Sequence, residues 1–222
     1  MANKYNSIFV KAYSFILDNT LAKISWGWLA KLKNKNGKYY KLSNEDLSTF
    51  KSHLANNYYV IATRRDIHLT TYLIAFASWV KTGKASWYSH VLLNIEPDDV
   101  TTEDDHWFEE ATGAGVHYSK FMEVFNVDSA VLLKPKNLSL EDWNIIVGEA
   151  VKQIGKPYDD IFQYNDNTHL SCVEVILDGL RALPDYYEKF PNLEAMIKKV
   201  GNITPQMYYD CQDFEVVFEV RN

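Results

Sequence analysis

The most informative part of this sequence is Leu170-Ser171-Cys172-Val173-Glu174-Val175-Ile176. Val173, Ile176 and Leu180 recur at helical spacing, which predicts an amphipathic helix that begins at Cys172. The N–H groups of a first helical turn and the helix dipole both favour negative charge at that end. A cysteine there is a candidate nucleophile, although a free thiol taken alone is more often an inert buried residue.

A candidate base and a candidate acid precede this helix. His90 lies in the apolar strand Tyr88-Ser89-His90-Val91-Leu92-Leu93, and Glu109-Glu110-Ala111-Thr112-Gly113 forms a second predicted strand. Successive strand residues point to opposite faces, so only one of Glu109 and Glu110 can face His90. Taken singly, the histidine can be a packed residue and the acids an exposed pair. Together with Cys172 they supply the nucleophile, base and orienting acid of a cysteine hydrolase.

Composition restricts the classes of function. The chain has 222 residues, 47% of them hydrophobic and 14% aromatic, with a net charge of −6, so it is globular and nucleic-acid binding is not indicated. Two cysteines, Cys172 and Cys211, make no disulfide framework, and the absence of an HExxH element argues against a metal site; no cofactor is expected. The N-terminus does not resemble a signal peptide, and the longest apolar run, residues 72–80, is too short to span a bilayer. These features predict a product that is cytoplasmic as synthesised, with no integral membrane segment.

We expect two regions of different character. Residues 1–57 read as an extension with a helix over 8–21, a hairpin turn at Asn36-Gly37 and a capping box at Ser43 and Asp46. Residues 58–222 read as one α+β domain. Its expected strands cover 58–62, 88–95, 107–111, 115–118, 130–133 and 214–220, and its expected helices cover 69–80 (mostly buried), 140–154, 172–183 and 193–200.

The motifs occur in an order that resembles a known family. They are Asp66-Ile67-His68-Leu69-Thr70, Tyr88-Ser89-His90-Val91, Phe108 to Val116 (FEEATGAGV), Ile154-Gly155-Lys156-Pro157-Tyr158-Asp159, Ser171 to Val175 (SCVEV) and Ile203-Thr204-Pro205. In this order they are similar to the permuted papain-like amidases, a YiiX-like, circularly permuted branch of the NlpC/P60 cysteine peptidases. The resemblance leaves out residues 1–57. It implies a permuted papain-like fold, in which an antiparallel sheet packs against helices that include the nucleophile helix.

The resemblance also implies roles for particular residues. Cys172 would be the nucleophile, His90 the general base and Glu110 the orienting acid, since the family's acid directly precedes an alanine. Tyr158, Ser171 and Tyr88 would contact substrate. Ser171 stands where the family has an aromatic residue and Val173 where it has a serine, so the wall of the site differs from the family pattern.

The function expected from this resemblance is hydrolysis of a peptide or amide bond through a thioester, with bacterial cell-wall peptides as the leading substrate. A lipid acyl hydrolase or acyltransferase is the second enzyme alternative. A non-catalytic component of a larger particle is the third, with residues 1–57 docking to a partner. A composition rich in Asn, Lys and Tyr suits a virus of bacteria, which would deliver the enzyme to the cell wall.

Overall fold

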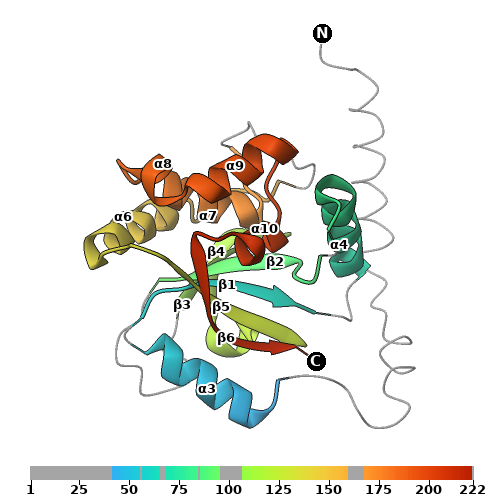
Figure 1. The fold of residues 1–222 in the computed structure, drawn as a ribbon. Helices are drawn as coiled ribbons and strands as arrows, with labels where there is room; N and C mark the ends of the chain where they lie inside the picture. Colours follow the sequence, from blue (N-terminus) through green and yellow to red (C-terminus); the bar gives the residue numbers. More distant parts are fainter. Residues whose placement is uncertain are drawn as a thin grey trace.

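The computed structural model describes residues 42–55, 57–65, 69–84, 86–95, 107–159 and 168–221 (Figure 1). The helix predicted over 8–21, the hairpin at Asn36-Gly37 and the motif residues 66–68 lie outside the described residues.

A six-stranded antiparallel sheet forms the centre of the molecule. The strands lie in the order β4-β3-β2-β1-β5-β6. Their bounds are β1 Val60–Arg64, β2 His90–Asn94, β3 Trp107–Thr112, β4 Gly115–Lys120, β5 Ser129–Pro135 and β6 Phe214–Arg221. All six correspond to expected strands, which confirms the mixed α+β class. The register sets Thr63 opposite His90 and Glu110 opposite His117, so it decides which polar side chains share a face.

Helices cover both faces of the sheet. They are α3 Asn44–Leu54, α4 Leu69–Thr82, α5 Phe121–Val124, α6 Leu140–Val151, α7 Cys172–Arg181, α8 Tyr186–Lys189, α9 Pro191–Val200 and α10 Pro205–Asp210. Alternation along β1 sends Val60 into a core shared with α6 to α10 and Ile61 into a second core shared with α3 and α5. Figure 1 shows these two layers above and below the sheet. No described helix combines the length and apolar character needed to cross a bilayer.

Helix α3 belongs to the second of these cores. The capping box predicted for it is present, because Asp46 N donates to Ser43 Oγ and Ser43 N donates to the Asp46 carboxylate. Phe50 and Leu54 of this helix are fully buried, and Phe50 packs on Phe218 of β6 with ring centroids 4.7 Å apart. Residues 42–55, which the sequence analysis assigned to the extension, therefore share a hydrophobic core with the sheet.

The helix that begins after Ser139 is shorter than predicted. Ser139 caps it as expected, but regular α-helix ends at Val151, and a turn carries the chain to Gly155 at φ +89°. This turn docks on β4, since Gly155 N donates to Val116 O (2.9 Å) and Val116 N donates to Lys156 O (2.8 Å). The short helices α5, α8 and α10 were not predicted.

The expectation that the helix over 69–80 is mostly buried is wrong. Among the side chains of this helix that the structure describes, Thr71 and Ser78 are buried, whereas Tyr72, Phe76, Trp79 and Val80 are exposed. An apolar sequence predicts the helix but does not determine which of its faces meets the rest of the protein.

Candidate active site

The first residue of α7 is Cys172, and the structure holds this helix end firmly. Ser171 N and Ser171 Oγ both donate to Glu174 Oε2, at 2.8 and 2.6 Å, and Tyr208 Oη donates to Val173 O at 2.8 Å. Ser171 is itself fully buried, so its side chain closes the helix end instead of lining an open surface. Cys172 is buried at the N-terminal turn, where the helix dipole favours an anion.

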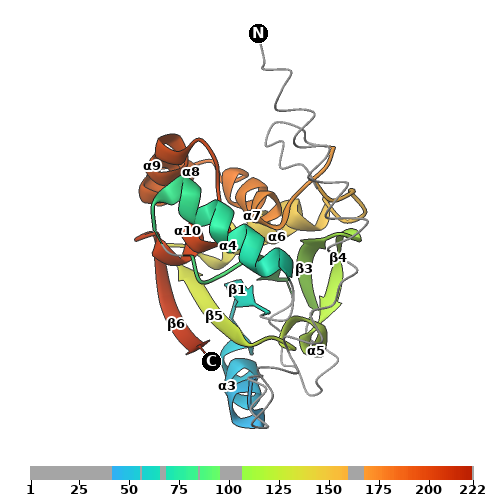
Figure 2. The ribbon, with the colours of Figure 1, turned by 90° about the vertical axis from the view of Figure 1, so that its right-hand side faces the viewer.

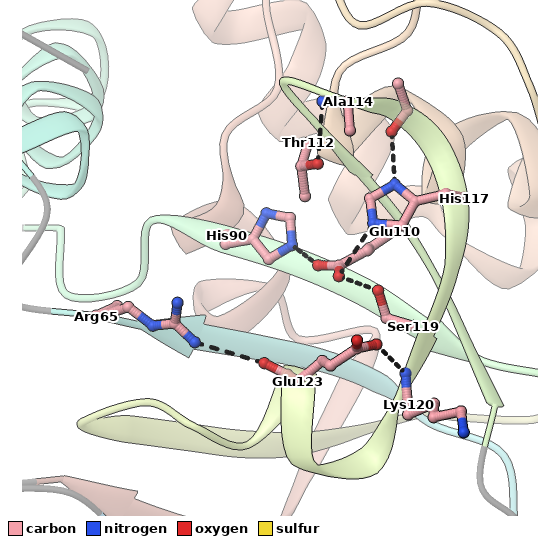
Figure 3. Close-up of polar contacts among 10 residues, drawn as sticks. Arg65, His90, Glu110, Thr112, Ala114, His117, Ser119, Lys120 and Glu123 are labelled. Carbon is pink, nitrogen blue, oxygen red and sulfur yellow. Dashed lines mark hydrogen bonds and ion pairs between the residues drawn. The ribbon is translucent and has the colours of Figure 1, made fainter. Parts of the chain in front are cut away.

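His90 is the first residue of β2 and contacts Glu110 of the neighbouring strand β3. His90 Nε2 lies 2.7 Å from Glu110 Oε2 (Figure 3). A carboxylate only accepts hydrogen bonds, so Nε2 carries the proton and donates, which leaves Nδ1 as the nitrogen available to Cys172. The His90 side chain is 25% exposed, so a substrate can approach a ring that is otherwise enclosed.

The electrostatic environment of the site favours a positively charged His90 beside a negatively charged Glu110. Burial lowers the pKa of His90, but the charge and hydrogen bonding of Cys172 and of Glu110 outweigh it and raise the pKa to about 10. Burial alone would raise the pKa of Glu110, yet hydrogen bonds from His90 and Ser119 and the charge of His117 lower it to about 2. At neutral pH the imidazole is therefore cationic and Glu110 anionic.

The two consecutive glutamates of β3 have opposite electrostatic environments. The sequence left open which of the two glutamates faces His90, and in the structure it is Glu110. Glu109 is fully buried on the other side of the strand, and burial raises its pKa to about 8. Neither Glu109 carboxyl oxygen has a hydrogen-bond partner within the described part of the chain. Glu109 is therefore neutral at pH 7 and cannot serve as the orienting carboxylate.

Strand β4 adds two residues that the sequence analysis did not assign to the site. Ser119 Oγ donates to Glu110 Oε1, and His117 Nε2 lies 3.6 Å from the same oxygen (Figure 3). His117 Nδ1 donates to Gly115 O at 2.9 Å, which fixes the ring. The sequence did contain a sign that these two residues lie together, because residues 117 and 119 of a strand share one face. The register of β4 on β3 then places that face beside Glu110.

Tyr158 and Tyr88 differ in their relation to the site. Tyr158 forms a parallel bridge with Leu170, and Leu170 N donates to Pro157 O at 3.0 Å, so the Pro-Tyr element lies beside the start of α7. Tyr88, in contrast, is fully buried, and its hydroxyl donates to Glu219 of β6. The structure therefore places Tyr88 in the core and not at a surface that a substrate could contact.

Two other kinds of reactive site remain to be considered, the second cysteine and a metal-binding cluster. Cys211 is buried, and burial raises its pKa to about 12, so it is an unreactive thiol. Across the described ranges, no group of three or more His, Cys, Asp or Glu side chains is arranged to hold a metal ion.

Comparison with known proteins gives a fold relationship. No protein-family profile and no curated protein matches the sequence. Among solved structures, the chain is similar to the crystal structure of metalloprotein yiiX from Escherichia coli O157:H7, described as DUF1105. The TM-score is 0.54 with 18% sequence identity, over 76% of this chain and 99% of that chain. At this identity the two proteins share a fold, and the relationship carries no activity or metal with it.

Proposed function

We propose that the protein is a cysteine hydrolase with a permuted papain-like fold, which cleaves an amide bond through a thioester. The observation that carries this proposal is the convergence of three elements: Cys172 at the start of α7 interacts with His90 of β2, which donates to Glu110 of β3. The motif order and the YiiX-like fold support the NlpC/P60 relationship.

The proposed reaction uses this geometry in two steps. The Cys172 thiolate attacks the substrate carbonyl, the C–N bond breaks, and the His90 imidazolium gives its proton to the leaving amine. Neutral His90 then takes a proton from water, and the resulting hydroxide releases the acid and regenerates the thiolate. Backbone N–H groups of the first turn of α7 would stabilise each oxyanion. Glu110 keeps the imidazole oriented and supports its positive charge throughout. No step requires a metal ion.

Bacterial cell-wall peptides remain the leading substrate, on the strength of the family resemblance. A lipid acyl hydrolase or acyltransferase is the second candidate, and the observation that favours it is the exposed aromatic face of α4. Release of amine from muropeptides or of fatty acid from lipids would distinguish them. The third alternative is that the protein is a non-catalytic component of a larger particle.

Alkylation of Cys172 by iodoacetamide as a function of pH tests the proposal before any substrate is known. Cys211 is an internal control, because its raised pKa makes it unreactive. His90→Ala is the test variant, and His169→Ala is the matched control, since His169 is an exposed histidine three residues before the nucleophile.

We expect Cys172 to react much faster than Cys211 at mildly acidic pH, because the His90 imidazolium stabilises the reacting sulfur. His90→Ala should slow this reaction at acidic pH by about tenfold or more, because the thiolate loses its cation, and His169→Ala should leave it unchanged. Equal rates in wild type and His90→Ala, in a folded protein, would refute the thiolate–imidazolium pair.

A further inference from the structure

Helix α4 presents its polar residues inward and its aromatic residues outward. Thr71 Oγ1 donates to Arg65 O at 2.8 Å, and Ser78 Oγ donates to Thr204 Oγ1 at 3.0 Å, so two buried hydroxyls anchor the helix. On the opposite side Phe76 is 60% exposed and Trp79 is 50% exposed. A helix on an aqueous surface has the reverse arrangement, with its apolar stripe against the core.

The exposed side chains form one continuous stripe. Tyr72, Phe76, Trp79 and Val80 follow the spacing of a single helical face. Phe76 and Trp79 touch, with ring centroids 5.8 Å apart. Figure 2 shows α4 crossing the outer side of the molecule, in front of the sheet. Exposed apolar stripes of this kind mark contact surfaces.

The charge of this segment departs from that of the whole chain. Residues 67–95 contain no Asp or Glu, although the protein has 29 acidic residues and a net charge of −6. Lys81 and Lys84 follow the aromatic stripe in the sequence, and Lys84 is exposed. Arg64 also lies over the Tyr72 ring, 5.2 Å from its centroid, but it is buried, so the exposed cation of this segment is Lys84. An apolar stripe followed in the sequence by lysines, in a segment without carboxylates, complements an anionic surface.

The buried face of α4 contacts the segment that leads into β2. Ser89 Oγ donates to Thr71 Oγ1 at 3.4 Å, and Ser89 directly precedes His90. The aromatic stripe lies on the opposite side of the helix and stays free for a partner.

We propose that α4 is an interfacial helix that binds the surface of an anionic phospholipid membrane. Its aromatic stripe would enter the boundary between headgroups and acyl chains, where Trp and Tyr are favoured, and the cations would meet anionic headgroups. The helix would lie in the plane of the membrane and not cross it. This inference goes beyond the proposed function and does not depend on the reactivity of Cys172.

Co-sedimentation of the full chain with vesicles tests the inference. The probes are vesicles of phosphatidylcholine alone and of phosphatidylcholine mixed with phosphatidylglycerol, at low and high salt. The test variant is Phe76→Ser with Trp79→Ser, two exposed positions whose replacement removes no core packing. The matched control is Leu140→Ser with Ile145→Ser, which removes exposed apolar side chains from α6.

We expect binding to the anionic vesicles that weakens with salt, and a loss of about tenfold or more in affinity for the α4 variant but not for the α6 variant. Brominated lipids should quench the wild-type fluorescence more than that of Trp79→Phe. Cys172 alkylation, measured on the same samples, reports separately on the proposed function.

Several outcomes would overturn the inference. Wild-type protein that stays in the supernatant with both vesicle types excludes a membrane surface. Binding that the α4 variant retains in full assigns the contact to another surface. A wild-type dimer that the α4 variant converts to a monomer, without vesicle binding, makes the stripe an interface between two copies of the chain.

Discussion

Replacing Glu109 with glutamine tests the contrast between the two neighbouring glutamates of β3. Burial raises the pKa of Glu109 from its ordinary value of 4.5 to about 8. Between these two values the folded protein keeps a proton that the unfolded chain has released. The free energy of unfolding therefore falls as the pH rises through this window and levels off above it.

The size of the effect follows from the pKa shift. One pKa unit corresponds to about 1.4 kcal/mol, so the wild-type protein loses at most about 5 kcal/mol between acidic pH and about pH 8.5. Glutamine keeps the shape of a neutral carboxylic acid and does not titrate. We expect Glu109→Gln and wild type to differ little near pH 5, and the variant to be more stable by about 3–5 kcal/mol near pH 8.5.

Urea denaturation at a series of pH values measures this difference. Glu188→Gln is the control, because Glu188 is exposed and its loss removes no buried carboxyl group. A stability difference between Glu109→Gln and wild type that stays constant from pH 5 to about pH 8.5 would show that Glu109 is not held neutral by burial, and the reasoning would fail.

Two further predictions concern the neighbourhood of the site. Gly115→Ala should cost about 2–4 kcal/mol in thermal unfolding, because Gly115 has φ +95° and a Cβ there would lie 2.6 Å from Lys156 O. Gly113→Ala, where a Cβ meets nothing within 4 Å, should cost less than about 1 kcal/mol. Ser119→Ala should slow Cys172 alkylation near pH 6 by about three- to tenfold, because the Glu110 carboxylate that orients His90 loses one of its hydrogen bonds; an unchanged rate would exclude Ser119 from the site.

The features of the candidate site that depend on neighbouring residues could be predicted from the local sequence. The apolar stripe behind Cys172 predicted where α7 begins, and Ser139 predicted the start of α6. The alternation of Glu109 and Glu110 predicted that one of them faces His90. Helix starts and strand faces follow from residues within a few positions of one another, so a single sequence contains them.

Contacts between distant segments could not be predicted in this way. Tyr88 is in the core because β6 brings Glu219 to its hydroxyl, and nothing near Tyr88 indicates that partner. His117 joins the site only through the register of β4 on β3. Ser171 was expected to contact substrate because it stands where the family has an aromatic residue, but the glutamate three residues later makes it a helix cap.

The position of α4 between β1 and β2 has a consequence for protein engineering. Adjacent antiparallel strands can be joined by a turn of two to five residues, yet this chain uses residues 65–89 to connect Arg64 to His90. The pairing of Val60 with Leu93 and of Thr63 with His90 is made by the strands themselves. A shorter loop in place of α4 would therefore leave the pairing of β1 with β2 intact, provided that the core residue Tyr88 is kept, and would separate β2 from its outer helix.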